Sequence, residues 1–258
     1  MPHLLTEPDH LLLATFFIAA IAAWVHGFIG LGFPLITTPL LTLLTDLHTA
    51  VIATILPNIA INVLSIARGG HWSESIGRHW PLAVYVLLGS VIGTQLLIGL
   101  PAMPLKIFLA LAILVSLNLD RLKRLDWHGV LSHPHLAPAF FGILAGIFSG
   151  TVNVSVPPLA IYFLGLSLTP VATVQLFNLC FIVGKVTQAV SLAIAGELGM
   201  DTLLASVPLT VISLAALAAG MRWQKRMSGN RYRLWLNRTL LVMAVVLIIQ
   251  VSIELATG

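Results

Sequence analysis

Apolar blocks separated by short polar connectors occupy most of the chain. One membrane-spanning helix needs about 20 apolar residues. Most blocks are near that length, whereas the first and fifth are too long for one span and too short for two. The pattern predicts an all-α, multi-pass membrane protein. The blocks are residues 11–45, 48–67, 81–100, 105–119, 138–166, 169–195, 202–221 and 236–256.

The two long blocks contain glycine and proline in their interiors. Glycine weakens a helix through backbone entropy, and proline removes a hydrogen-bond donor. Within lipid, non-helical backbone is tolerated only where protein or a water-filled cavity covers it. We therefore expect two hairpins of shortened helices, with irregular stretches at residues 30–34 and 151–155. The interrupting residues are Gly27, Gly30, Gly32, Pro34 and Pro39 in the first block, and Gly142, Gly146, Gly150, Pro157 and Pro158 in the fifth.

Composition excludes several classes of soluble protein. Of 258 residues, 58% are hydrophobic and 9% are charged, and the mean hydropathy is +1.01. Because soluble domains carry about 25% charged residues, a soluble enzyme, a nucleic-acid binder and a secreted mini-protein are excluded. Cys180 is the single cysteine, so the chain can form no internal disulfide and no cysteine metal cluster. We expect no metal and no cofactor.

Charge predicts the orientation in the cytoplasmic membrane. Of the 13 basic residues, 11 lie in or beside the connectors 68–80, 120–135 and 222–235, which should face the cytoplasm. Both termini and the connectors near Asp46 and Glu197 are acidic or lack basic residues, and should lie outside. The N-terminus lacks the basic region of a signal peptide, so we expect the first apolar block to be retained.

This orientation predicts two inverted repeats. Residues 1–120 form the first and residues 121–258 the second, and each has a broken hairpin followed by three spans. A shift of 119 residues aligns Gly27 with Gly146 and Pro39 with Pro158. The alternative is that glycine-rich membrane helices are alike because small residues let helices pack closely.

Polar side chains mark one face of the span that follows each hairpin. At about 100° per residue, four polar residues of block 48–67 share one stripe, and so do polar residues of block 169–195. Inverted-repeat transporters bind substrate near the midplane, where such hairpins and helices meet. The predicted substrate-binding residues are His26, Gly30, Gly32, Thr54, Asn58, Asn62, Ser149, Thr151, Asn153, Gln175, Asn178 and Lys185; Ser65 completes the first stripe.

Lys185 is the strongest indication of an anion site. It lies far from both ends of its block, and the nearest acidic residues, Glu197 and Glu254, lie at the outer boundary of the spans. Helix N-termini at the two breaks would add a positive dipole end. The alternative is that Lys185 reaches outer water or Glu197. The lack of acidic residues in the middle of the spans argues against a cation site.

Other polar residues have structural alternatives. Asn58 and Asn62 can join helices by hydrogen bonds, and Thr54 and Ser65 can bond to their own helix. His26 is either a satisfied buried histidine or a proton carrier.

Several motifs resemble the sulfite exporter TauE/SafE family of transporters. They are Gly27–Pro34 with Pro39-Leu40-Leu41 and Ala53-Thr54, then Gly142–Gly150 with Pro157-Pro158-Leu159, and the loop Arg68-Gly69-Gly70-His71-Trp72. The resemblance covers nearly the whole chain and implies transport of sulfite or organosulfonates.

The leading hypothesis is a secondary transporter for a small sulfur-containing anion, working by alternating access and coupled to protons through His26. One alternative is facilitated uptake of thiosulfate or sulfite, with Cys180 engaging sulfur. A non-transporting membrane subunit is a second alternative. An enzyme is disfavoured because no paired histidines, HExxH helix or intramembrane aspartates are present. Besides the substrate, we expect membrane lipid as a partner and no nucleic acid.

Overall fold

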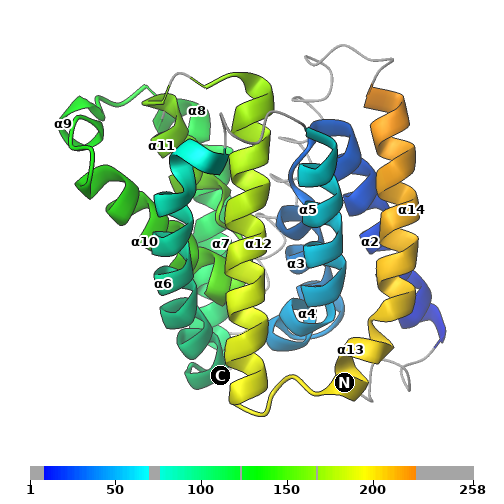
Figure 1. Ribbon diagram of the computed structural model, residues 1–258. Helices are drawn as coiled ribbons and strands as arrows, with labels where there is room; N and C mark the ends of the chain where they lie inside the picture. Colours follow the sequence, from blue (N-terminus) through cyan, green and yellow to red (C-terminus); the bar gives the residue numbers. More distant parts are fainter. Residues whose placement is uncertain (1–8, 70–75, 123, 167, 225–258) are drawn as a thin grey trace.

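The computed structural model describes residues 9–69, 76–122, 124–166 and 168–224 (Figure 1). Throughout these residues, every regular element is a helix, which confirms the all-α prediction. Four helical segments are long and apolar enough to cross a membrane, and a bent pair makes a fifth. The chain is therefore a multi-pass membrane protein. The predicted span 236–256 lies outside the described residues.

The helices follow the predicted blocks in order. The first hairpin is α2 (Asp9–Ile29) with α3 (Phe33–Leu44), and the second is α10 (Leu136–Val152) with α11 (Val156–Leu164). The remaining helices are α4 (Leu47–Ala53), α5 (Ile55–Gly69), α6 (Arg78–Gly99), α7 (Ala102–Leu117), α8 (Leu119–Leu122), α9 (His128–Leu131), α12 (Pro170–Ile194), α13 (Met200–Ala205) and α14 (Val207–Gln224).

Both hairpins are broken, but over shorter stretches than predicted. In the first, Gly30 and Gly32 have φ angles of 92° and 114°, a left-handed conformation that glycine adopts without steric cost. In the second, Asn153 has φ 61° and caps α10. The two breaks lie in equivalent places, because α10 ends 123 residues after α2 and α11 begins 123 residues after α3. The offset between the two breaks is therefore 123 residues, four more than the predicted shift of 119.

The prediction that Gly142, Gly146 and Gly150 interrupt their block is wrong, because α10 continues through all three. They recur every four residues on the side of α10 that packs against α6. A Cβ on Gly146 would lie 2.2 Å from the carbonyl oxygen of Val86, and one on Gly150 would lie 2.4 Å from that of Ser90. These glycines therefore let two helix backbones approach closely.

The block 48–67 is bent, where a single straight span was predicted. Helices α4 and α5 meet at Thr54 at an angle of 44°. Pro57 explains the bend, since a proline inside a helix removes one N–H and its ring clashes with the carbonyl four residues earlier. That carbonyl belongs to Ala53, the last residue of α4.

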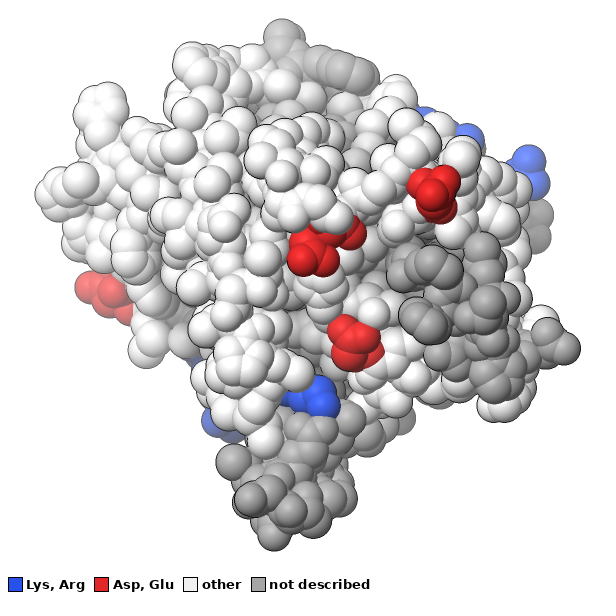
Figure 2. Space-filling model, turned by 90° about the horizontal axis from the view of Figure 1, so that it is seen from below, with Lys and Arg blue, Asp and Glu red and all other residues white. Residues whose placement is uncertain are grey.

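The bundle has two chemically different ends. Helices α4 and α13 lie at one end and α8, α9 and α11 at the other (Figure 1); we call them the α13 end and the α8 end. Figure 2 looks onto the α13 end and shows separate acidic side chains across it. Arg121 lies in α8, while Asp46 caps α4 and Asp201 lies in α13. Lys106, near the start of α7, is a basic residue at the α13 end.

Candidate functional site

Asn153 connects the second hairpin to both halves of the molecule. Its left-handed backbone turns the chain from α10 into α11. Its Nδ2 donates hydrogen bonds to Thr38 Oγ1 of α3 at 3.1 Å and to Thr54 Oγ1 at the α4–α5 bend at 3.4 Å. Its Oδ1 accepts a hydrogen bond from Lys185 Nζ of α12. One side chain thus joins three segments that lie far apart in sequence.

Lys185 is buried, with 1% of its side chain exposed. Its ammonium donates to Asn153 Oδ1 and to Gln188 Oε1. The alternative in which Lys185 reaches outer water or Glu197 is therefore wrong; Glu197 lies 4.0 Å from His48 instead. The side chains that touch the ammonium are neutral amides, so its charge has no carboxylate partner among the described residues.

Gln188 and Thr38 belong to this site, although the sequence did not single them out. Gln188 Nε2 donates to the Gly150 carbonyl at 2.7 Å, which fixes the amide so that its oxygen faces Lys185. Its position three residues after Lys185 places it on the same helix face, which was an available signal. Thr38 gave no such signal, because only the folded first hairpin brings it to Asn153.

His26 lies at the break of the first hairpin and is fully buried. The Phe33 N–H, at the first position of α3, donates to His26 Nδ1 at 3.3 Å. On the other side of the ring, Nε2 lies 3.2 Å from Ser65 Oγ of α5, which donates to the Ile61 carbonyl. Since Nδ1 accepts, Nε2 carries the ring proton and donates to Ser65. His26 therefore caps α3 from the preceding helix as a neutral imidazole.

Asn178 holds the same break from the side of α12. Its Nδ2 donates to the Gly30 carbonyl at 2.8 Å and to the Val174 carbonyl at 2.7 Å. Because Asn178 and Lys185 are seven residues apart on one helix, they differ in height by about 10 Å. The two breaks thus contact α12 at different heights: Gly30 of the first break at Asn178, and Asn153 of the second break at Lys185.

Asn58 and Asn62 lie on α5, which packs against α12. Both are fully buried, and Asn62 Nδ2 donates to the carbonyl and the side-chain oxygen of Asn58. Within the described part of the chain, Asn58 Nδ2 and Asn62 Oδ1 have no hydrogen-bond partner. A buried polar atom without a partner costs about 1–3 kcal/mol, and such atoms in native proteins are often explained by a missing ligand or water.

The other predicted residues have structural contacts. Thr54 and Ser65 do bond to their own helices, and Thr54 also accepts from Asn153. Thr151 donates to the Ile147 and Gly93 carbonyls at the packing surface between α10 and α6. Gly184 of α12 lies against Ser149, and Gln175 is buried. Gly32 is buried, and no described atom lies within 4 Å of where its Cβ would stand.

The helix N-termini at the breaks offer fewer donors than predicted. In α3 the first N–H is already bonded to His26 and the second residue is Pro34. In α11, Pro157 and Pro158 follow the first residue. Proline has no N–H, so the donors of this region come mainly from side chains.

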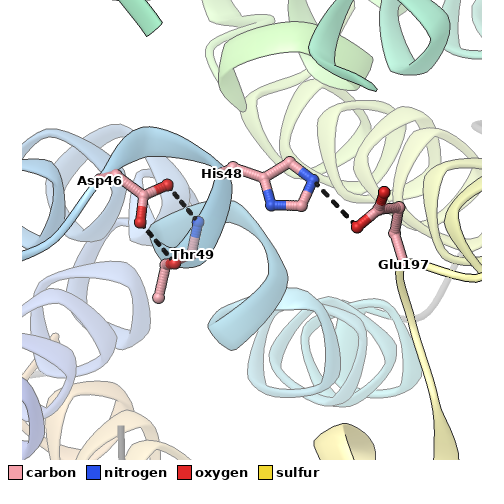
Figure 3. Close-up of polar contacts among 4 residues, drawn as sticks. All are labelled: Asp46, His48, Thr49 and Glu197. Atoms are coloured by element: carbon pink, nitrogen blue, oxygen red, sulfur yellow. Dashed lines mark hydrogen bonds and ion pairs between the residues drawn. The ribbon is translucent and has the colours of Figure 1, made fainter. Parts of the chain in front are cut away.

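An apolar cluster lies around the α4–α5 bend, next to the polar residues. Ile52 and Ile55, which flank the α4–α5 bend, pack with Leu192 and Leu198. At the α13 end, His48 Nε2 lies 4.0 Å from Glu197, linking α4 to the connector after α12 (Figure 3). Partial burial raises the pKa of the neighbouring Asp46, but hydrogen bonds from Thr49 and the nearby His48 bring it below its usual value overall.

Cys180 lies apart from these polar groups. It is buried among apolar and aromatic side chains that include Phe177, Phe181 and Tyr162. These surroundings are typical of a cysteine that serves packing.

One family profile matches most of the chain. The sulfite exporter TauE/SafE family matches residues 15–247, which include the breaks of both hairpins, Asn153 and Lys185. No curated protein and no solved structure matches the chain. The chain therefore belongs to the sulfite exporter TauE/SafE family, a family of membrane transporters for sulfite or related anions.

Proposed function

We propose that this protein is a secondary transporter that moves sulfite or a small organosulfonate across the cytoplasmic membrane by alternating access. The observation that carries the proposal is Lys185, which is buried and bonded only to neutral amides among the described side chains. An unpaired cation at this depth is costly. A bound anion would supply the missing negative charge. It would lie next to Asn153, whose side chain bonds to α3 in the first half of the chain and to α12 in the second.

The unpartnered amide atoms on α5, which packs against α12, support a transient ligand between these two helices. Asn58 Nδ2 is a buried donor with no acceptor among the residues that the structure describes, and the oxygens of sulfite or a sulfonate are strong acceptors. A site that must release its ligand benefits from donors left open rather than satisfied by protein. The proposed substrate-binding residues are therefore Lys185 and Asn58, with Asn153 positioning the ammonium of Lys185.

We propose that the two halves are inverted repeats. In support, α2 packs most extensively against α14, and α10 against α6. Each long hairpin helix thus packs against the second of the three spans in the other half. The first hairpin returns to the α13 end, where α3 leads into α4, whereas α11 of the second hairpin lies at the α8 end (Figure 1). Such repeats provide the two related conformations that alternating access requires.

We also propose that the α8 end faces the cytoplasm, and cysteine labelling tests this. Ser132, next to α9, and Met200, in α13, are both exposed. In a Cys180→Ser background, Met200→Cys should react with a membrane-impermeant maleimide added to intact cells. Ser132→Cys should react only after permeabilisation. The reverse pattern would invert the proposed topology.

Proteoliposome flux tests the function. Purified protein should transport radiolabelled sulfite and methanesulfonate. It should not transport sodium, which is a cation, or taurine, whose ammonium and sulfonate charges cancel. Empty liposomes and heat-inactivated protein serve as controls. Accumulation driven by an ion gradient would support a secondary transporter, whereas mere equilibration of sulfite and thiosulfate would favour facilitated uptake. If no anion moves, a non-transporting subunit becomes the better hypothesis.

His26 offers a test of proton coupling. The coupling hypothesis is not favoured by the geometry, because Nδ1 accepts the Phe33 N–H and cannot bind a proton unless that bond opens. Glutamine provides one acceptor and one donor without titrating. We therefore expect His26→Gln to keep most of the flux and its pH profile, and His26→Leu to lose most of the flux. A pH profile flattened by His26→Gln would instead identify His26 as the proton carrier.

A further inference from the structure

The buried polar residues of the described chain can supply at most one positive charge while His26 is neutral. Lys185 and His26 are the titratable polar side chains among them. The other buried polar side chains are hydroxyls and amides, which contribute no net charge. Among the described residues, an anion entering this site therefore meets at most one cation, the ammonium of Lys185.

His26 adds no second charge in this conformation. A protonated imidazole donates from both ring nitrogens, but the Phe33 N–H points at Nδ1. Protonation would place two donors against each other at the start of α3. The geometry therefore keeps the ring neutral while the break is closed.

The two breaks do not supply a second anchor either. Helix N-termini hold multiply charged anions through several free N–H groups. Here the first turns of α3 and α11 contain Pro34, Pro157 and Pro158, which have no N–H to donate. The N–H of Phe33 is already bonded to His26 Nδ1. Neutral amides such as Asn58 can solvate oxygen atoms but cannot neutralise charge.

From this arrangement we infer that the site selects anions by charge: it accepts singly charged sulfonates and hydrogen sulfite, and it excludes dianions such as sulfate. The inference rests on the proposed function. Removing a dianion from water costs more than removing a monoanion, and one buried ammonium offsets only one charge. The second charge of sulfate would remain uncompensated in a region of low dielectric.

A shape-matched pair of competitors tests this selection. Methanesulfonate is a monoanion on both sides of neutrality, whereas methylphosphonate changes from monoanion to dianion as the pH rises through neutrality. Each is added unlabelled against radiolabelled methanesulfonate, and its potency is expressed relative to unlabelled methanesulfonate at the same pH. This ratio cancels any effect of pH on the protein. We expect the relative potency of methylphosphonate to fall at least about tenfold from the acidic to the alkaline side, and sulfate not to compete.

A charge-neutralising variant provides the second arm. Asn153→Asp keeps an oxygen for Lys185 but adds a carboxylate, so methanesulfonate flux should fall at least about tenfold. Asn118→Asp is the matched control, because Asn118 is exposed at the end of α7, and it should transport normally. Size-exclusion profiles and thermal midpoints establish that both variants are folded. If Asn153→Asp does not fold, the competitor ratio decides alone.

The outcomes separate the inference from the function on which it rests. If neither sulfite nor methanesulfonate moves, the proposed function fails. If methanesulfonate moves while sulfate and dianionic methylphosphonate compete equally well, the function stands and charge selection is overturned.

Discussion

Lys185→Met is expected to abolish anion flux without unfolding the protein. An ion pair at about 4 Å with an effective dielectric constant of about 20 is worth about 4 kcal/mol. That energy corresponds to an affinity change on the order of a thousandfold. Because the other described side chains at the site are neutral, nothing nearby replaces the lost attraction. Sulfite and methanesulfonate flux should therefore fall to the level of empty liposomes.

The fold should tolerate this substitution. Methionine is similar in length to lysine. Replacing the buried ammonium with an uncharged side chain also removes a desolvation cost of several kcal/mol. Against that gain, Asn153 and Gln188 each lose a donor, at about 1–3 kcal/mol per unsatisfied acceptor. The thermal midpoint should therefore change little.

Lys106→Met is the matched control, since Lys106 lies near the start of α7 rather than in the polar core. It should transport as the wild type does. If the Lys185→Met protein is folded and still transports at the wild-type rate, Lys185 does not bind the anion, and the site belongs nearer to Asn178 and the first break.

The sequence predicted the polar centre better than it predicted the backbone around it. Asn153, Lys185 and Thr54 were all singled out, and the structure brings them into one hydrogen-bonded group. Intramembrane polar residues are rare enough that each is informative by itself. Gln188 was missed because a glutamine near the end of a span gives a weaker signal, and its role depends on a contact with Gly150.

The backbone was harder to predict because glycine and proline have several roles. Gly30 and Gly32 allow a left-handed turn, whereas Gly146 lies inside a continuous helix and serves packing. Sequence alone does not show which role applies, because packing depends on the neighbouring helix. Pro57 did carry a readable signal for the bend at Thr54, through the carbonyl four residues earlier.

Gly146→Val is expected to have the largest effect on stability. A Cβ at this position would lie 2.2 Å from the Val86 carbonyl oxygen and 2.7 Å from the Ser90 nitrogen. Both are backbone atoms of α6, so no side-chain rotation relieves the overlap and the two helices must separate. Overpacking of side chains costs about 1–3 kcal/mol, and we expect at least the upper value because backbone must move.

Gly99→Val is the matched control, because Gly99 ends α6 and no described atom lies within 4 Å of its Cβ position. Thermal unfolding in detergent and size-exclusion chromatography should show a large loss of folded protein for Gly146→Val alone. Flux should fail with it, since α10 positions Asn153 against Lys185. A Gly146→Val protein as stable as Gly99→Val would show that α6 and α10 do not pack at this distance, and that the glycines of α10 have another role.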